Sequence, residues 1–191
     1  MKIVCVKGAN MKHKPALVVM DIQEGFFGEK AKLPIHNENK NSFLNDIREL
    51  IGTWAKNGRD VIYVRTIYGK WSLLNLFTNS AVKKGTEGTS LISSIYRKGF
   101  PVFDKNTPNI FKNDDFEKYL QENHHKEIVI CGVFIEYCVS RAAFTAKNKG
   151  YKVSVITDLV GYRNKDRFVA ILKKMEKAGI TLNGKDKYKN L

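Results

Sequence analysis

Apolar runs typical of β-strands recur along the chain, and several are continuous rather than alternating. They lie at 16–20, 61–66, 101–105, 127–132 and 152–157. Continuous apolar runs are expected when both faces of a sheet are covered, whereas half-exposed strands alternate between apolar and polar residues. The pattern therefore predicts a sheet buried between two layers. The N-terminal stretch "MKIVCV" is compatible with an additional strand.

Segments with helical periodicity separate these runs. In the segment 41–56 the apolar residues form a single helical face: Phe43, Ile47, Leu50, Ile51 and Trp54. Three further helices are predicted over 114–123, 138–149 and 165–178. The alternation of strands and helices predicts an α/β fold, a doubly wound and mainly parallel sheet with helices on both faces. The length of 191 residues suits a single domain over 1–191.

The segment 67–100 is the least regular part of the chain. It contains four glycines and mixes polar with apolar residues throughout. "SLISSIY" at 90–96 is compatible with a short helix, and the remainder is predicted to be a long loop. Long loops of this kind usually lie over an active site.

Charge and composition limit the classes of partner. The chain has 33 Lys+Arg against 19 Asp+Glu, a formal net charge of +14. Such a charge attracts polyanions, but the lysines are spread along the chain and no nucleic-acid-binding motif accompanies them. We therefore expect a solvated, lysine-rich surface. Nucleic-acid binding is an alternative that the salt dependence of binding would test.

Location and redox state follow from short segments and from the cysteines. No stretch approaches the length of a membrane span, and the apolar run of the N-terminus is shorter than a secretory signal requires. The three cysteines are too widely spaced for a disulfide framework or a metal-binding pair. These features predict a cytoplasmic protein with at least one free thiol, and no association with membranes.

Three residues of complementary chemistry follow predicted strands. Asp21 comes directly after the run 16–20, Lys105 ends the run at 101–105, and Cys138 lies just beyond the run that ends at Gly132. Ligands of parallel sheets bind outside the carboxyl ends of the strands, so we expect these side chains to converge there. A carboxylate can take the proton of a thiol, and an ammonium group lowers the thiol pKa. With Cys138 predicted to begin a helix, the amides there would favour a thiolate.

The motifs around these residues resemble the isochorismatase-like cysteine hydrolases, a family that includes nicotinamidases and N-carbamoylsarcosine amidohydrolase. "ALVVMDIQEGFF" resembles the family's opening motif, "VFDKNTPNIF" its lysine segment, and "CGVFIEYCVSRAAFTAKNKGYKVSVITD" its cysteine segment. The resemblance covers roughly residues 15–180 and implies a catalytic triad of Asp21, Lys105 and Cys138. It also implies a small-molecule substrate and a homo-oligomer.

The resemblance further implies a cis peptide bond between Val133 and Phe134. That bond would direct the amide of Phe134, together with the amide of Cys138, toward an oxyanion. The family usually has a small residue in place of Phe134 and a threonine in place of Ile135. The pocket is therefore expected to be narrower or more apolar than is usual in the family.

A catalytic metal is not expected. Nicotinamidases of the family carry a D-x-H-x-x-x-H arrangement after the second strand, and here the matching stretch reads "VRTIYGKWSLLN", without histidine. The four histidines of the chain lie elsewhere, and His124-His125 is predicted to be a solvated helix end. We therefore predict neither a metal nor another cofactor, and no nicotinamidase activity.

Other residues near the strand ends are candidates for the substrate pocket. They are Gln23, Phe26, Trp71, Val133 and Ile135, and Tyr162 could complete an aromatic wall with Phe26 and Trp71.

For several polar and cysteine residues a structural role is the simpler interpretation. Gln23 is expected mainly to form hydrogen bonds near the triad, and Glu136 to bind backbone amides in its turn. Arg65 and Arg163 are expected in surface ion pairs rather than on a substrate carboxylate. Cys131 is expected in the packing of a buried strand, and Cys5 is likewise assigned no chemical role.

Three functions remain open at this point. The first is hydrolysis of a small amide, carbamoyl or ureido C–N bond through a Cys138 thioester, with Asp21 as base and Lys105 as electrostatic support. The second is hydrolysis of a vinyl ether of the isochorismate type, which needs no cysteine. The third is a non-catalytic, regulatory role in which Phe134 and Ile135 block the pocket.

Overall fold

A six-stranded parallel sheet forms the centre of the protein, which a computed structural model describes over residues 14–36 and 40–189. The strands are β1 (Ala16–Met20), β2 (Val61–Thr66), β3 (Val102–Lys105), β4 (Glu127–Gly132), β5 (Lys152–Val160) and β6 (Thr181–Asn183). Their order in the sheet is β3-β2-β1-β4-β5-β6, and every neighbouring pair is parallel. The five predicted strands and the parallel sheet are confirmed. The short strand β6 was not predicted, and "MKIVCV" lies outside the described residues.

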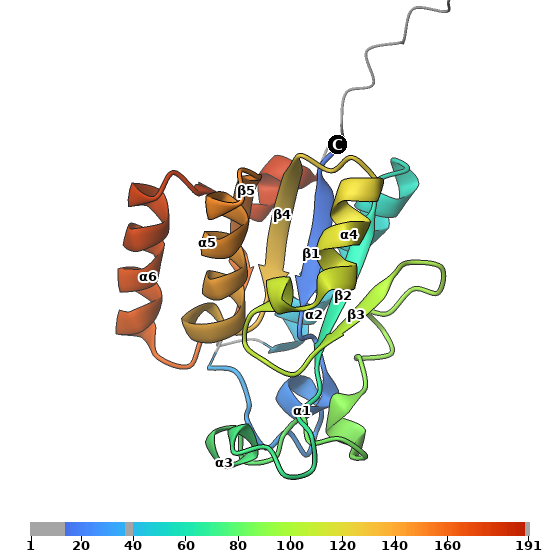
Figure 1. Cartoon of the computed structure of the whole chain (residues 1–191), viewed down its shortest axis with the longest axis vertical. Helices are drawn as coiled ribbons and strands as arrows, with labels where there is room; N and C mark the ends of the chain where they lie inside the picture. Colours follow the sequence, from blue (N-terminus) through green and yellow to red (C-terminus); the bar gives the residue numbers. More distant parts are fainter. Residues whose placement is uncertain (1–13, 37–39, 190–191) are drawn as a thin grey trace, which may run out of the picture.

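Helices cover both faces of this sheet (Figure 1). They are α1 (Glu24–Phe27), α2 (Lys40–Lys56), α3 (Leu74–Phe77), α4 (Asp114–Glu122), α5 (Ser140–Asn148) and α6 (Lys165–Lys177). Three 3₁₀ turns, η1 (Glu87–Thr89), η2 (Ile110–Lys112) and η4 (Lys185–Tyr188), and one π-helical turn, η3 (Ile135–Val139), complete the regular elements. In the described ranges, no helix is both long and apolar enough to cross a membrane.

Two hydrophobic clusters fill the space between the layers. On one face, the apolar side of α2 packs on the sheet, and the side chains predicted for that side are all buried. On the other face the sheet packs against apolar side chains of α4, α5 and α6. The continuous apolar runs of β1, β2 and β4 reflect this cover on both faces.

In the segment between β2 and β3, the helical turns lie at other positions than the sequence indicates. The predicted short helix at 90–96 is wrong: this stretch forms turns, with Ile92 and Ile95 buried and the Ile92 amide donating to the carbonyl of Ile22 at 3.0 Å. Helix α3 and turn η1 form instead. Long-range contacts with the chain after β1 therefore determine the conformation of this segment.

The strand order reverses direction between β1 and β4. After β1 the chain adds β2 and then β3 on one side of β1. It then crosses to the other side of β1 and adds β4, β5 and β6 there. Crevices form outside the carboxyl ends of the strands at such a point. Helices α1 and α3 lie beyond this end of the sheet (Figure 1), whereas the strands begin at the opposite end.

Candidate functional site

Asp21 stands immediately after β1, at the switch point of the sheet. Its side chain is buried, with 1% exposed, and its φ of 56° lies in the left-handed region. Aspartate enters this region more readily than most residues, although it is uncommon there. The Asp21 amide donates to the Val64 carbonyl of β2 at 2.9 Å, which holds the carboxylate at the carboxyl edge of the sheet.

Lys105 and Cys138 contact each other beside this carboxylate. Lys105 Nζ donates to Asp21 Oδ2 at 2.8 Å and lies 3.2 Å from Cys138 Sγ. Lys105 is 4% exposed and Cys138 is 9% exposed. Three residues widely separated in the sequence thus form one buried group, as the strand-end argument predicts.

Thr66 is a fourth member of the group, and the sequence argument did not select it. It ends β2, which lies between β1 and β3 in the sheet, and it pairs in register with Lys105. Its hydroxyl donates to Asp21 Oδ1 at 2.9 Å and accepts a hydrogen bond from Lys105 Nζ. Thr66 follows the same strand-end rule as Asp21, but a threonine at the end of a strand has no distinctive chemistry that would single it out.

Gln23 fixes the position of Thr66 through hydrogen bonds to the backbone. Its Oε1 accepts from the Thr66 amide at 2.8 Å, and its Nε2 donates to the carbonyls of Thr66 and Thr89, both at 3.0 Å. The side chain is fully buried. The expected structural role is therefore confirmed, and it extends to fixing Thr66 and the turn at Thr89.

The turn that leads from β4 to Cys138 requires glycine at its start. Gly132 has φ 113°, and a Cβ at this position would overlap the carbonyl oxygen of Met20 in β1. The next amide, of Val133, donates to that same carbonyl at 2.9 Å. The peptide bond between Val133 and Phe134 is cis, as the resemblance implied.

Cys138 lies in a π-helical turn rather than at the start of an α-helix. Turn η3 runs over Ile135–Val139, and α5 begins at Ser140, so the helix start predicted at residue 138 is wrong. Glu136 fastens this turn, because its Oε1 accepts from the amides of Arg163 at 2.7 Å and Asn164 at 2.8 Å. Its expected role as a ligand of backbone amides is confirmed, and the amides belong to the residues just before α6.

Burial governs the electrostatics of the thiol. Burial, followed by the neighbouring Asp21 carboxylate, raises the pKa of the Cys138 thiol to about 12, although Lys105 acts in the opposite direction. For Lys105, burial is the largest single effect and would lower the pKa, but the interactions with Asp21 and Cys138 together outweigh it and the pKa is raised. The expectation of a lowered thiol pKa is therefore wrong. The resting group consists of an ammonium–carboxylate pair beside a neutral thiol.

Tyr68 is a further residue of this site that the sequence argument missed. Burial and then the electrostatic interaction with Cys138 raise the pKa of its phenol to about 12, with smaller effects from Lys105 and Asp21. The phenol therefore lies within electrostatic range of all three groups. Tyr68 is buried, and its backbone pairs with the chain at Val82 and Lys84. It occurs in the irregular segment, where no periodic pattern marks a buried residue.

Four of the predicted pocket residues are buried, and they belong to different parts of the core. Phe26 and Phe134 are buried and pack edge to face, with ring centroids 5.2 Å apart, while Val133 and Ile135 are fully buried. Phe134 belongs to the cluster beneath α2, and Ile135 to the opposite cluster, which contains Cys138.

The proposed aromatic wall does not form in this chain. Trp71 is 96% exposed and therefore does not pack against the other two rings, and its place in a substrate pocket stays a prediction. Tyr162 packs against Phe168 of α6 in a tilted arrangement, with ring centroids 4.9 Å apart. Of the three aromatic residues, Phe26 alone lies in the core beside the turn of the cysteine segment.

A cavity of about 300 Å³ lies where β3 ends. Its lining consists of Ile67, Asp104, Lys105, Asn106, Thr107, Lys112 and Asn113. Lys105 is one of its lining residues, whereas Asp21 and Cys138 are not.

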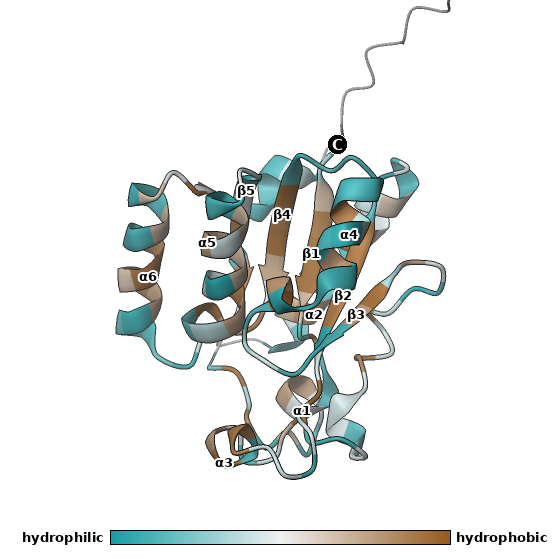
Figure 2. Ribbon diagram, in the orientation of Figure 1, coloured by the Kyte–Doolittle hydropathy of each residue, from teal (hydrophilic) through white to brown (hydrophobic). Residues whose placement is uncertain are grey.

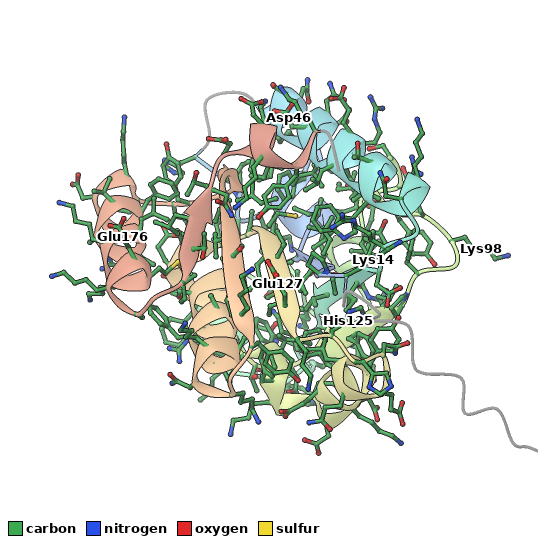
Figure 3. The ribbon with its side chains drawn as sticks, turned by 90° about the horizontal axis from the view of Figure 1, so that it is seen from above. Lys14, Asp46, Lys98, His125, Glu127 and Glu176 are labelled. Atoms are coloured by element: carbon green, nitrogen blue, oxygen red, sulfur yellow. The ribbon has the colours of Figure 1, made fainter. Side chains whose placement is uncertain are left out.

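Three further predictions concern residues away from this site. Arg65 forms a partly exposed ion pair with Asp104, with Nε 2.7 Å from Oδ1, and Cys131 is buried within β4, both as expected. The prediction that His125 is solvated is wrong. It is buried, with Nε2 2.7 Å from Asp60 Oδ2 and Nδ1 3.3 Å from the Lys14 carbonyl. Figure 3 shows His125 and Lys14 at the end of the sheet where the strands begin.

Within residues 14–36 and 40–189, no three His, Cys, Asp or Glu side chains are grouped as ligands of a metal ion would be. The stretch from the end of β2 onward, residues 64–75, contains no histidine and no acidic residue. Thr66 is already engaged with Asp21 and Lys105. The residues present do not fit that metal site, and the chemistry below uses the side chains of the chain alone.

Comparison with known proteins gives a consistent result. The family model described as "Isochorismatase domain" matches residues 15–185. YddQ, an isochorismatase family protein of Bacillus subtilis, is 28% identical over 144 residues, which is 75% of this chain and 75% of YddQ.

Solved structures share the fold. An isochorismatase-like hydrolase from Alkaliphilus metalliredigens superposes with a TM-score of 0.82 at 22% identity, covering 92% of this chain and 97% of that one. N-carbamoylsarcosine amidase from Thermoplasma acidophilum gives a TM-score of 0.79 at 24% identity, covering 91% and 97%. The family model spans nearly the whole sequence, so the chain belongs to the isochorismatase family of hydrolases.

Proposed function

We propose that the protein hydrolyses a C–N bond of a small amide, carbamoyl or ureido compound, with Cys138 as nucleophile, Asp21 as general base and Lys105 as electrostatic support. One observation carries the proposal: Lys105 Nζ bridges the Asp21 carboxylate, at 2.8 Å, and the Cys138 sulfur, at 3.2 Å. In such a group the carboxylate can remove the thiol proton as the sulfur attacks the substrate. An enzyme that forms a covalent intermediate needs a nucleophile activated in this way.

The first half-reaction forms a thioester. The raised pKa keeps the Cys138 thiol neutral at rest, so its proton moves to the Asp21 carboxylate as sulfur attacks the carbonyl carbon. The new C–S bond gives a tetrahedral oxyanion. When the oxyanion collapses, the C–N bond breaks and Asp21 returns the proton to the leaving nitrogen, which departs as ammonia or an amine.

The second half-reaction restores the enzyme. Asp21 takes a proton from water, and the resulting hydroxide attacks the thioester carbon. The C–S bond then breaks, and the proton held by Asp21 returns to the sulfur. Lys105 is charged at rest, because Asp21 and Cys138 together raise its pKa, and it stabilises the sulfur while negative charge develops there.

The amides of Phe134 and Cys138 are the proposed donors to the oxyanion. The chain around Phe134 is held on both sides, since the Val133 amide donates to Met20 and the Ile135 amide to the carbonyl of Gly161 at 3.0 Å. Donors fixed in this way need no rearrangement when the charge forms, which is the property that an oxyanion hole requires.

The low exposure of the group favours a small substrate. Asp21, Lys105 and Cys138 are each at least nine-tenths buried. A peptide segment would need an open groove above them, whereas a compact amide needs only a narrow entrance. Tyr68, within electrostatic range of the triad, is a candidate hydrogen-bonding partner for such a substrate.

A panel of small amides, carbamates and ureas, assayed for ammonia release, tests the proposal. We expect at least one compound to be hydrolysed by the wild-type chain and by Cys131→Ala, and none by Cys138→Ala. Cys131 is a matched control because it is also buried and lies in β4, outside the proposed chemistry. Equal turnover by the Cys138→Ala variant would refute the cysteine mechanism.

The same panel separates the other two functions. Hydrolysis of a vinyl ether such as isochorismate releases pyruvate rather than ammonia, so pyruvate in place of ammonia would favour ether hydrolysis. A chain that released neither product, while it still folded, would favour a regulatory role.

A further inference from the structure

The hydrogen-bond donors of Lys105 are all used within the protein. An ammonium group has three N–H bonds. In Lys105 they are directed to Asp21 Oδ2 at 2.8 Å, to the hydroxyl oxygen of Thr66, and to Cys138 Sγ at 3.2 Å. The side chain is 1% exposed, so each donor depends on an acceptor in the protein. The contact with the sulfur therefore depends on how the three N–H bonds are shared.

Thr66 controls this sharing. Its hydroxyl has a single hydrogen, which it donates to Asp21 Oδ1 at 2.9 Å, while its oxygen accepts from Lys105. The two oxygens of the Asp21 carboxylate thus have different donors. Thr66, Asp21 and Lys105 form a closed ring of hydrogen bonds, and no nitrogen or oxygen atom of these three side chains is buried without a partner.

Removal of the hydroxyl would change which acceptors Lys105 uses. Asp21 Oδ1 and one N–H of Lys105 would both lose their partner, and an unpaired buried polar group is costly. These two groups can pair with each other, because an ammonium group beside a carboxylate can donate to both of its oxygens. Lys105 would then turn toward Asp21. The contact that it gives up is the one with Cys138, since sulfur is the weakest of the three acceptors.

The fold places Thr66 without help from its hydroxyl. The residue is 2% exposed and pairs in register with Lys105 on β3. Its amide donates to Gln23 Oε1 at 2.8 Å, and its carbonyl accepts from Gln23 Nε2 at 3.0 Å. A β-branched side chain also has few χ1 rotamers available to it. The position of the hydroxyl is therefore set by the backbone of β2, and the charged groups arrange themselves around it.

We propose that Thr66 is a positioning residue, whose hydroxyl occupies Asp21 Oδ1 and so leaves one N–H of Lys105 for the sulfur of Cys138. Thr66 acts on the thiol through Lys105, which is the neighbour that opposes the rise in the thiol pKa. The consequence for turnover rests on the proposed function. The sharing of donors can be tested without a substrate.

Alkylation of Cys138 by iodoacetamide at pH 9 tests the sharing of donors. We expect the rate to fall about tenfold in Thr66→Val, because the thiolate loses a hydrogen bond from a charged group. Thr66→Ser restores the hydroxyl and should react nearly as the wild type does. Thr157→Val is the matched control, since Thr157 is a partly buried threonine of β5 whose hydroxyl donates to the carbonyl of Asn183, outside the group.

The rate of Cys131, measured in the same digests, separates a change at the thiol from a general opening of the fold. An unchanged or higher ratio of the Cys138 rate to the Cys131 rate in Thr66→Val would overturn the proposal. An equally slow Thr66→Ser would also overturn it, because the hydroxyl would not be the cause. Thr66→Ala, a second variant without the hydroxyl, should behave as Thr66→Val does, so the result does not depend on one substitution.

Steady-state kinetics connect this arrangement to turnover. With an amide from the panel, Thr66→Val should lower kcat about tenfold or more and keep KM within about twofold, and Thr66→Ser should recover the loss. A raised KM at constant kcat would assign Thr66 to substrate binding and contradict the positioning role. If the wild type hydrolysed no compound of the panel, the proposed function would fail, whereas the alkylation rates would still decide the role of Thr66.

Discussion

At the scale of single residues, the site is defined by a buried ion pair with a neutral thiol beside it. Asp21 and Lys105 are each about 1% exposed at the side chain, and their shared neighbours are Thr66 and Cys138. In such a setting, removing one charge leaves the other unpaired in a medium that cannot solvate it. The triad should therefore influence folding as well as chemistry.

Replacement of Lys105 by methionine should lower the free energy of unfolding by about 3–5 kcal/mol, because the Asp21 carboxylate would remain buried without its partner. Urea denaturation measures the loss. The matched control is Arg65→Met, which removes the neighbouring but partly exposed pair with Asp104 and should cost only about 0–1 kcal/mol. Equal losses in the two variants would mean that the buried pair has no special energetic role.

The reactivity of Cys138 should follow its raised pKa. At neutral pH we expect native Cys138 to react with iodoacetamide more slowly than in the urea-unfolded chain, because the buried thiol, with a pKa of about 12, is neutral. Its rate should rise as the pH increases into the alkaline range. Peptide mass spectrometry reads each cysteine separately, with buried Cys131 as the internal reference. Rapid labelling of Cys138 at pH 6 would show a resting thiolate.

At the scale of elements, the turn after β4 sets the geometry of the site. Gly132 starts it at a positive φ, the cis bond follows, and the π-helical turn places Cys138 before α5 begins. Glu136 ties the turn to the start of α6 through two amides. Each of these parts belongs to a stretch of eight residues, so the local sequence determines much of the arrangement.

Gly132→Ala should destabilise the fold by more than the conformational cost of a left-handed residue, which is about 1–2 kcal/mol, because the added Cβ also overlaps the Met20 carbonyl. Gly150→Ala is the matched control, since Gly150 has φ 89° but nothing within 4 Å of the added carbon. Thermal unfolding of both variants measures the difference. If the two melt alike, the close approach of β1 and β4 has no energetic consequence.

The sequence predicts these elements well where the same pattern recurs along the chain, either an apolar run or a polar residue that follows one. The apolar runs predict five parallel strands, and the positions of Asp21, Lys105 and Cys138 after strands predict their convergence. The sequence predicts a helix start at Cys138 where the structure has a π-helical turn, because the helical period is visible only downstream of that turn. β6 was missed because three residues are too few for a pattern.

Contacts between distant residues explain the other errors. His125 is buried through Asp60, which lies 65 positions away, and no local pattern announces that pairing. The turns at 90–96 depend on residues near Ile22. Burial also reverses the expected pKa of Cys138, because the sequence identifies the neighbouring charges but not the extent of desolvation.

At the scale of the whole molecule, charge and apolar surface are segregated. The net charge of +14 comes from lysines and arginines spread along the sequence, while the longest uncharged run, residues 71–82, contains the exposed side chains of Trp71, Leu73, Leu76 and Phe77. Figure 2 shows hydrophilic colour on parts of α4, α5 and α6. The exposed apolar side chains of 71–77 therefore lie in a part of the chain without charged residues.

The central claim concerns a covalent bond to Cys138, and mass spectrometry of the acid-quenched enzyme during turnover tests it most directly. With an amide that the panel identifies as a substrate, we predict a mass increase equal to the acyl or carbamoyl group, on the peptide that contains Cys138. The adduct should be absent in Cys138→Ala, which should also release no ammonia. Continued ammonia release by Cys138→Ala would contradict the account.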